Sequence, residues 1–171
     1  MRKLLILGAG GYGKTIADVA RQLNSYGDIA FLDDNSTAPD VLGKCEDVFR
    51  LSDDKTDVYP AFGNNTGRMQ WLERLLEAGI SVPTLVHPRA YVSPTAKLGI
   101  GVTVLPMAVV NTRVTVENGS IINIGALIDH DSVIGAGTHL APGAIVKAEN
   151  RIPGMIKIDS GTVIENREYP L

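Results

Sequence analysis

The stretch INIGALIDHDSVIGAGTHLAPGAIV, from Ile122 to Val146, repeats with a period of six residues. Every sixth residue in it carries a large aliphatic side chain, namely Ile122, Ile128, Ile134, Leu140 and Val146. A six-residue period fits neither the α-helix, with about 3.6 residues per turn, nor the heptad of a coiled coil. It is typical of a β-solenoid, in which each short strand turns one aliphatic side chain inward.

The period continues in both directions from this stretch. The full series is Val86, Val92, Leu98, Val104, Val110, Val116, Ile122, Ile128, Ile134, Leu140, Val146, Ile152, Ile158 and Ile164. The residue four positions further on is mostly small, and glycine or asparagine often follows the aliphatic residue, where it tolerates the strained backbone of a corner. Three hexads make one triangular coil, so fourteen hexads predict about 4.7 coils. Because so short a solenoid leaves apolar faces uncovered, we expect it to oligomerise.

The first half of the chain has a different pattern. Apolar strand runs alternate with helical spacing, which predicts a parallel sheet with helices on its faces. The expected strands are Lys3–Leu7, Asp28–Leu32, Asp57–Phe62 and Ser81–Val86, and the expected helices run from Ile16 to Leu23 and from Met69 to Ala78. The segment from Asn35 to Thr56 is expected to be mostly loop. The domains are therefore predicted as residues 1–82 and 83–171.

A glycine-rich turn follows the first strand. Gly8, Gly10 and Gly13 match the G-x-G-x-x-G pattern between strand and helix, and Asp33 lies 20 residues beyond Gly13. Such a turn presents backbone N–H groups and a helix N-terminus to a phosphate. Since this half of the chain supplies only one mononucleotide-binding unit, it favours a nucleotide or nucleotide sugar over NAD. A glycine turn without a ligand is the alternative.

Composition excludes several functional classes. Hydrophobic residues make up 44% and charged residues 20% of the chain, which is a globular composition. The formal charge of −3 offers no basic surplus for nucleic acid or an anionic membrane. The single cysteine, Cys45, excludes an intramolecular disulfide and a cysteine-rich zinc site. The apolar run Leu4–Leu7 is too short for a signal peptide or a membrane span, so we expect a soluble, cytoplasmic protein.

Four stretches carry a resemblance to a known family. They are Gly8–Gly13, Phe31–Asp34, Gly63–Asn65 and Asn123–His139. Together with the hexad repeat, they resemble the nucleotide-sugar acyltransferases of the left-handed β-helix superfamily, above all the bacillosamine-pathway UDP-4-amino-sugar N-acetyltransferases and the sialic acid O-acetyltransferases. The resemblance implies a small Rossmann-like domain followed by a left-handed parallel β-helix. It also implies a homotrimer with acetyl-CoA as co-substrate, bound between subunits, and no metal.

The resemblance assigns roles to individual residues. His130 matches the general base that removes a proton from the acceptor, a task suited to a pKa near 6.5, and Asp131 matches the acid that orients it. Asp129 competes with Asp131 for that role. The implied substrate-binding residues are Gly10, Gly11, Tyr12, Asp33, Asp34, Gly63, Asn64 and Asn123. The implied acetyl-CoA-binding residues are His139, Ala141, Gly143 and Ala148.

Several alternatives stay open at this point. The same base serves an amine or a hydroxyl acceptor, so O-acetylation of a sialic-acid-like sugar is the near alternative to N-acetylation. The short solenoid also fits a non-catalytic module that binds a sugar nucleotide. A zinc site built from His87, His130 and His139 is disfavoured because the three residues occupy different hexad positions. Asn64 and Asn65 also fit a simple turn before a helix.

Overall fold

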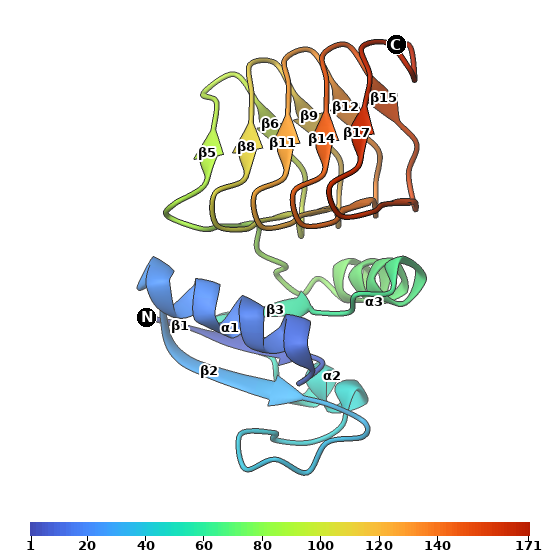
Figure 1. The fold of residues 1–171 in the computed structure, drawn as a ribbon. Helices are drawn as coiled ribbons and strands as arrows, with labels where there is room; N and C mark the ends of the chain where they lie inside the picture. The colour runs from blue at the N-terminus through green and yellow to red at the C-terminus, as the bar shows by residue number, and fades with distance from the viewer. The chain divides into compact units, whose positions relative to one another are not determined.

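The computed structural model describes all residues from 1 to 171 and divides the chain into two compact units, Met1–Pro83 and Thr84–Leu171 (Figure 1). The boundary predicted between residues 82 and 83 lies one residue before this division. None of the helices combines the length and the apolar character that a membrane-spanning segment needs.

The N-terminal unit is built on a three-stranded parallel sheet with the order β2-β1-β3. Its central strand is completely buried from Leu4 to Leu7, as expected for a parallel strand that has neighbours on both faces. The elements of this unit are β1 (Arg2–Leu7), α1 (Gly11–Leu23), β2 (Tyr26–Leu32), a 3₁₀-helix (Cys45–Asp47), α2 (Val48–Leu51), β3 (Thr56–Pro60) and α3 (Asn65–Glu77).

One prediction for this half of the chain is wrong in part. The expected strand Ser81–Val86 is interrupted: Ser81 forms an isolated bridge to Asp57, and only Leu85–Val86 is a strand, β4. Pro83 explains the interruption, because it has no N–H group to continue a ladder. The segment from Asn35 to Thr56 is mostly loop, as predicted. It also contains the short 3₁₀-helix and α2, which bury Cys45 and Val48 against the core of the unit.

The C-terminal unit is a parallel β-helix, as the hexad repeat predicts. Fourteen strands of two residues each form three sheets that we call the β4 face, the β5 face and the β6 face after their first strands. The β4 face contains β4 (Leu85–Val86), β7 (Thr103–Val104), β10 (Ile121–Ile122), β13 (His139–Leu140) and β16 (Lys157–Ile158). The β5 face contains β5 (Tyr91–Val92), β8 (Val109–Val110), β11 (Leu127–Ile128), β14 (Ile145–Val146) and β17 (Val163–Ile164). The β6 face contains β6 (Lys97–Leu98), β9 (Thr115–Val116), β12 (Val133–Ile134) and β15 (Arg151–Ile152).

The second residue of each strand points into the β-helix. Leu127 is 38% exposed, for example, whereas the next residue, Ile128, is 1% exposed. The aliphatic series read from the sequence therefore forms the core, together with the small residues between the strands, and this prediction is confirmed. Strands on one face pair with the strand 18 residues away, as Ile128 does with Val146.

Asn150 breaks the small-residue pattern and fastens the last coils together. Its side chain is completely buried, and Nδ2 donates to the carbonyl oxygens of Lys147 and Glu165, at 2.9 and 2.8 Å. Its Oδ1 accepts from the N–H of Tyr169 at 2.8 Å. One amide thus satisfies the main chain of two successive coils and of the C-terminal segment.

Replacing Asn150 by alanine is expected to lower the free energy of unfolding by about 2–4 kcal/mol, because main-chain groups of Lys147, Glu165 and Tyr169 lose their hydrogen bonds to the buried amide. Urea unfolding at a fixed protein concentration measures the change. Thr162→Ala is the matched control, since Thr162 occupies the same hexad position and is not fully buried. Equal stability of the two variants would contradict this role of Asn150.

Candidate active site

His130 lies in the corner between the β5 face and the β6 face, directly after β11. The main chain on both sides of it is fastened to the neighbouring coils. The N–H of Asp131 donates to the carbonyl oxygen of Thr112 at 3.0 Å, and the N–H of Glu149 donates to the carbonyl oxygen of His130 at 3.2 Å. The corner therefore holds the histidine on a rigid scaffold rather than on a loop.

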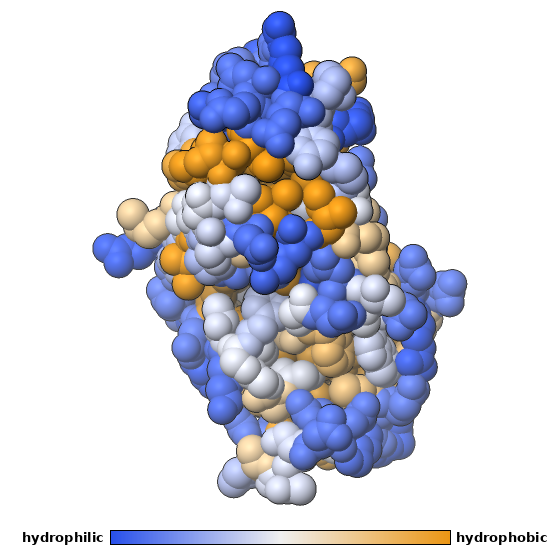
Figure 2. All heavy atoms as spheres, turned by 45° about the vertical axis from the view of Figure 1, so that its right-hand side comes forward, coloured by the Kyte–Doolittle hydropathy of each residue, from blue (hydrophilic) through white to orange (hydrophobic).

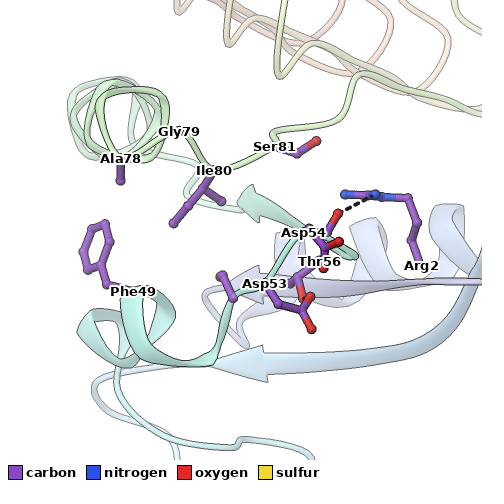
Figure 3. Close-up of a pocket in the computed structure, with 10 residues that line it drawn as sticks. Arg2, Phe49, Asp53, Asp54, Thr56, Ala78, Gly79, Ile80 and Ser81 are labelled. Atoms are coloured by element: carbon purple, nitrogen blue, oxygen red, sulfur yellow. Dashed lines mark hydrogen bonds between the residues drawn. The ribbon is translucent and has the colours of Figure 1, made fainter.

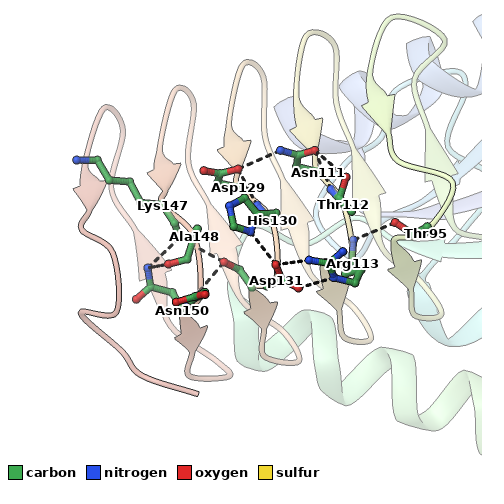
Figure 4. A network of polar contacts seen from close by, with 12 residues as sticks. Thr95, Asn111, Thr112, Arg113, Asp129, His130, Asp131, Lys147, Ala148 and Asn150 are labelled. Atoms are coloured by element: carbon green, nitrogen blue, oxygen red, sulfur yellow. Dashed lines mark hydrogen bonds and ion pairs between the residues drawn. The ribbon is translucent and has the colours of Figure 1, made fainter.

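A carboxylate orients the imidazole ring. His130 Nδ1 lies 2.7 Å from Asp131 Oδ2 (Figure 4). Arg113 donates two hydrogen bonds to the same carboxylate, from Nε to Oδ1 at 2.6 Å and from Nη2 to Oδ2 at 2.7 Å. Hydrogen bonds from Arg113 and from His130 lower the pKa of Asp131 to about 2. Since an ionised carboxylate only accepts hydrogen bonds, the hydrogen of the neutral ring sits on Nδ1 and the lone pair on Nε2.

The ring is also accessible. The side chain of His130 is 46% exposed, and Nε2 has no hydrogen-bond partner in the chain. An unprotonated, reachable ring nitrogen opposite an oriented one is the arrangement that a general base requires.

Asp129 plays a different part from Asp131. Its Oδ1 accepts from the N–H of His130 at 2.7 Å and from Asn111 Nδ2 at 3.0 Å. It therefore contacts the main chain of the histidine, whereas Asp131 contacts the ring. The two acidic residues that flank His130 thus divide the work of positioning it.

Asn123 and His139 form a separate pair on the β4 face. Asn123 Oδ1 accepts from the N–H of Ile124, and Asn123 Nδ2 lies 3.0 Å from His139 Nε2. Neither residue contacts His130 within the chain. The two histidines occupy different hexad positions, and in the β-helix His139 lies on the β4 face whereas His130 lies in the corner between the β5 and β6 faces.

His87 is a structural residue. It is 3% exposed, and its Nδ1 accepts from the N–H of Arg89 at 3.0 Å. Burial, assisted by the charge of Arg89, lowers the pKa of His87. No three His, Cys, Asp or Glu side chains of the chain come together as ligands for a metal ion.

The glycine-rich turn in the N-terminal unit has the geometry of a phosphate cradle. Gly8 has a φ of +100°, and a Cβ on Gly13 would overlap the carbonyl oxygen of Gly8. These two glycines make the turn and allow the close approach of α1. A Cβ on Gly10 or on Gly11 would meet nothing within 4 Å. The outer side of the turn is therefore open at the N-terminus of α1, where backbone N–H groups attract an anion.

Two predicted ligand-binding residues beside this turn have their carboxylates engaged in the loops. Asp33 Oδ2 accepts from the N–H of Ala9 at 2.7 Å, and Asp33 Oδ1 accepts from two further N–H groups of its own turn. The hydrogen bond from Ala9 is the largest cause of the lowered pKa of Asp33. Asp34 Oδ1 accepts from the N–H of Cys45 at 2.9 Å. Tyr12 places its hydroxyl 3.0 Å from that of Tyr59.

The loop Gly63–Asn65 caps α3 and covers a buried cation that sequence reasoning missed. Asn64 Oδ1 accepts from the N–H of Gly67 at 2.8 Å, as an N-cap residue does. Arg68 is completely buried and donates to the carbonyl oxygen of Phe62 at 2.9 Å and to Asn65 Oδ1 at 2.7 Å. Both asparagine side chains therefore shape the loop, and burial lowers the pKa of Arg68.

Two of the predicted acetyl-CoA-binding residues lie one coil beyond other site residues. Ala141 follows Asn123 by 18 residues, and Ala148 follows His130 by the same interval, so each lies above its counterpart in the next coil. Gly143 has a φ of +69° in the corner between the β4 and β5 faces.

The structure contains a cavity in the N-terminal unit and a hollow on the β5 face, and only the hollow lies beside a candidate site residue. A cavity of about 490 Å³ in the N-terminal unit is lined by Arg2, Phe49, Asp53 and Ser81 among others, at the start of β1 and β3 (Figure 3). It therefore lies at the opposite end of the strands from the glycine-rich turn. A hollow of about 350 Å³ on the β5 face is lined by apolar residues and by Asn111, Asp129 and Lys147. It adjoins the corner that carries His130.

Sequence reasoning missed Arg113 and Asn111 as well as Arg68. The 18-residue length of one coil could have revealed Arg113 and Asn111 as neighbours of the site. Arg113 lies 18 residues before Asp131, and Asn111 lies 18 residues before Asp129. Arg68 gives no comparable signal, since an arginine in a helix is normally on the surface.

Comparisons with known proteins agree with both units. Residues 3–75 match the PglD N-terminal domain family. Over 97% of this chain and 83% of the other, the structure is similar to the acetyltransferase domain of PglB from Neisseria gonorrhoeae FA1090, solved in complex with acetyl coenzyme A, with 37% sequence identity and a TM-score of 0.93.

Two more solved structures are similar. A histidine-to-asparagine mutant of perosamine N-acetyltransferase from Caulobacter crescentus, in complex with CoA and GDP-perosamine, has 26% identity and a TM-score of 0.81 over 98% of this chain and 90% of that one. WeeI from Acinetobacter baumannii AYE, at 23% identity and a TM-score of 0.89 over 100% and 85% of the two chains, shares the fold. The architecture is thus a Rossmann-like unit followed by a left-handed parallel β-helix, as predicted.

Proposed function

The chain belongs to the family of acyl-CoA-dependent sugar acetyltransferases with a left-handed β-helix, and we propose that it moves an acetyl group from acetyl-CoA to the amino group of a nucleotide-linked amino sugar, with His130 as the general base. One observation carries the role of His130. Its Nδ1 lies 2.7 Å from the ionised Asp131, while Nε2 is exposed and unpaired within the chain.

The proposed reaction follows from this geometry. The sugar amine attacks the thioester carbonyl carbon, a C–N bond forms, and Nε2 of His130 takes the proton that the nitrogen must lose. When the tetrahedral intermediate collapses, the C–S bond breaks and CoA leaves as a thiolate, which accepts the proton from the imidazolium. Asp131 stabilises the positive charge that the ring carries between these two transfers.

The N-terminal unit is proposed to bind the nucleotide sugar. The open glycine-rich turn at Gly10 and Gly11 offers N–H groups and the N-terminus of α1 to the phosphates. Tyr12, Gly63 and Asn64 line the same end of the sheet, at the carboxyl ends of β1 and β3, where parallel sheets bind ligands. Because their carboxylates are engaged by the main chain, Asp33 and Asp34 contribute mainly by holding the loops.

The β5 face supports the proposal of a homotrimer. Its five outward positions are all apolar, and they are Tyr91, Val109, Leu127, Ile145 and Val163. Tyr91 and Val163 are 53% and 42% exposed, and apolar side chains gather on the β-helix in Figure 2. The outward positions of the β6 face are mostly polar, namely Lys97, Thr115, Val133 and Arg151. We propose that copies of the chain cover the β5 face of one another.

Such an assembly would also complete the site. His130 and the pair of Asn123 and His139 lie on different parts of one β-helix, so the two groups would face one substrate only from neighbouring chains. Acetyl-CoA is proposed to lie along Ala141, Gly143 and Ala148. The cytoplasmic location, like the trimer, stays a prediction.

Incubation with acetyl-CoA and a panel of UDP-, GDP- and CMP-linked amino sugars and sialic acids tests the function. Release of free thiol with one amino sugar, and mass spectrometry of an amide product, are the expected results. Thiol release only with a hydroxyl acceptor would replace N-acetylation by O-acetylation. Binding of a sugar nucleotide with neither thiol release nor acetyl-CoA binding would favour the non-catalytic module instead.

A further inference from the structure

Three rows of residues with positive φ run along the corners of the β-helix, each repeating every 18 residues. Two rows are glycine at three of their four positions: one contains Gly101, Gly119, Gly137 and Met155, and the other contains Met107, Gly125, Gly143 and Gly161. The third row, at the corner of His130, contains Arg113, Asp131, Glu149 and Arg167. Every member of that row has a charged side chain.

This third row is unusual because residues with a Cβ are strained at positive φ. The φ angles of its members lie between 56° and 60°. Glycine adopts the same conformation without strain, and the other two corners use it. Because all four members of this row have side chains, we infer that the contacts of these side chains compensate for the backbone strain. Backbone strain of this kind is concentrated at functional sites.

The contacts in this row differ from coil to coil. Arg113 holds both oxygens of Asp131, and Asp131 Oδ2 in turn contacts the ring of His130 (Figure 4). Arg113 is itself held by Thr95, whose Oγ1 accepts from the Arg113 N–H at 3.1 Å. Two coils further on, Arg167 pairs with Glu149 in the same row. No histidine ring contacts Glu149.

We propose that Arg113 is a positioning residue for the transfer reaction, which fixes the plane of the Asp131 carboxylate so that Oδ2 faces His130 Nδ1 and leaves Nε2 to the substrate. The inference rests on the proposed function of His130 as the base. A two-point grip defines the plane of the carboxylate, whereas one hydrogen bond leaves it free to rotate. The positive guanidinium also stabilises the ionised form of Asp131, so the carboxylate orients the ring of His130 without removing the proton from Nδ1.

The same-row pair of Arg167 and Glu149 provides the control. Arg113→Gly and Arg167→Gly each remove a strained side chain and one ion pair at the same corner, and glycine suits the backbone of both positions. We therefore expect both variants to fold and to melt close to the wild-type temperature. Any difference in turnover then reflects the contact with the His130–Asp131 pair and not the corner itself.

The expected kinetic result is a fall in kcat of about tenfold or more for Arg113→Gly, with KM for both substrates nearly unchanged, because misorientation of the base affects the chemical step. Arg167→Gly keeps the wild-type kcat. Arg113→Lys, which retains the charge without the planar fork, recovers only part of the loss. Wild-type kcat in Arg113→Gly, or equal losses in the two glycine variants, would overturn the inference.

A second readout separates this inference from the proposed function. The ¹⁵N spectrum of His130 reports which ring nitrogen carries the hydrogen, and it needs no substrate. We expect hydrogen on Nδ1 in the wild type and in Arg167→Gly, and a mixture of tautomers in Arg113→Gly. An unchanged tautomer in Arg113→Gly would refute the positioning role. A wild-type protein with the ordered tautomer but without transferase activity would refute the proposed function alone.

Discussion

Replacing His130 by alanine is expected to lower kcat by about 10²- to 10⁴-fold, which is the range that a positioned general base contributes. The acceptor amine would then lose its proton to water during attack on the thioester, without an oriented group to receive it. KM should change little, because in the proposed reaction the ring contacts the reacting atoms and not the phosphates of either substrate. Initial rates of thiol release with acetyl-CoA and the sugar acceptor measure the effect.

The variant should keep its fold. The main-chain contacts of His130 with Asp129 and Glu149 do not involve the ring, so alanine preserves them. His139→Ala is the matched comparison: it removes the same kind of side chain from β13, two strands after β11, and is expected mainly to raise KM for acetyl-CoA. Retention of more than about one tenth of the wild-type kcat in His130→Ala would reject His130 as the base.

Replacing Leu127 by aspartate is expected to dissociate the proposed homotrimer and to abolish nearly all activity. Leu127 lies at the middle of the apolar β5 face and is 38% exposed in the single chain. In an assembly that covers this face, an aspartate would become a buried, unpaired charge, which strongly destabilises an interface. Sedimentation equilibrium over a range of protein concentrations measures the loss of the trimer.

Val133→Asp provides the control for this experiment. Val133 also occupies the outward position of its strand, but on the β6 face, where Lys97, Thr115 and Arg151 already meet solvent. It is expected to leave the oligomer intact. A Leu127→Asp protein that remains a trimer, or a wild-type chain that is a monomer, would refute the assembly through the β5 face.

The hexad repeat made most of the architecture predictable. Leu98, Ile128 and Ile158 stand in one register of the sequence and in one core because every coil has the same length, so a local period becomes a spatial row. The glycine-rich turn was predictable for a similar reason, since Gly8 and Gly13 respond to steric demands within a few residues. The interruption at Pro83 is also local. The proline is visible in the sequence, but the expected strand Ser81–Val86 continued through it.

The contacts of the candidate site were harder to predict from the sequence. The pattern Asp-His-Asp pointed to His130, yet it left two acids as partners, and only the corner geometry assigns the ring to Asp131 and the main chain to Asp129. The family resemblance implies that Asp33 and Asn64 bind the substrate. In the folded chain their oxygens accept from main-chain N–H groups, and short polar side chains satisfy either partner equally well.

The repeat, its aliphatic core and the position of the histidine can be read from the sequence, because each depends on spacing along the chain. The contacts between side chains of different coils, in contrast, become visible only in the folded chain. Arg113 reaches Asp131, and Asn150 reaches Glu165, because stacking brings residues about one coil apart within hydrogen-bond distance. That closeness depends on the coil being closed and stacked, and it gives these polar side chains their partners.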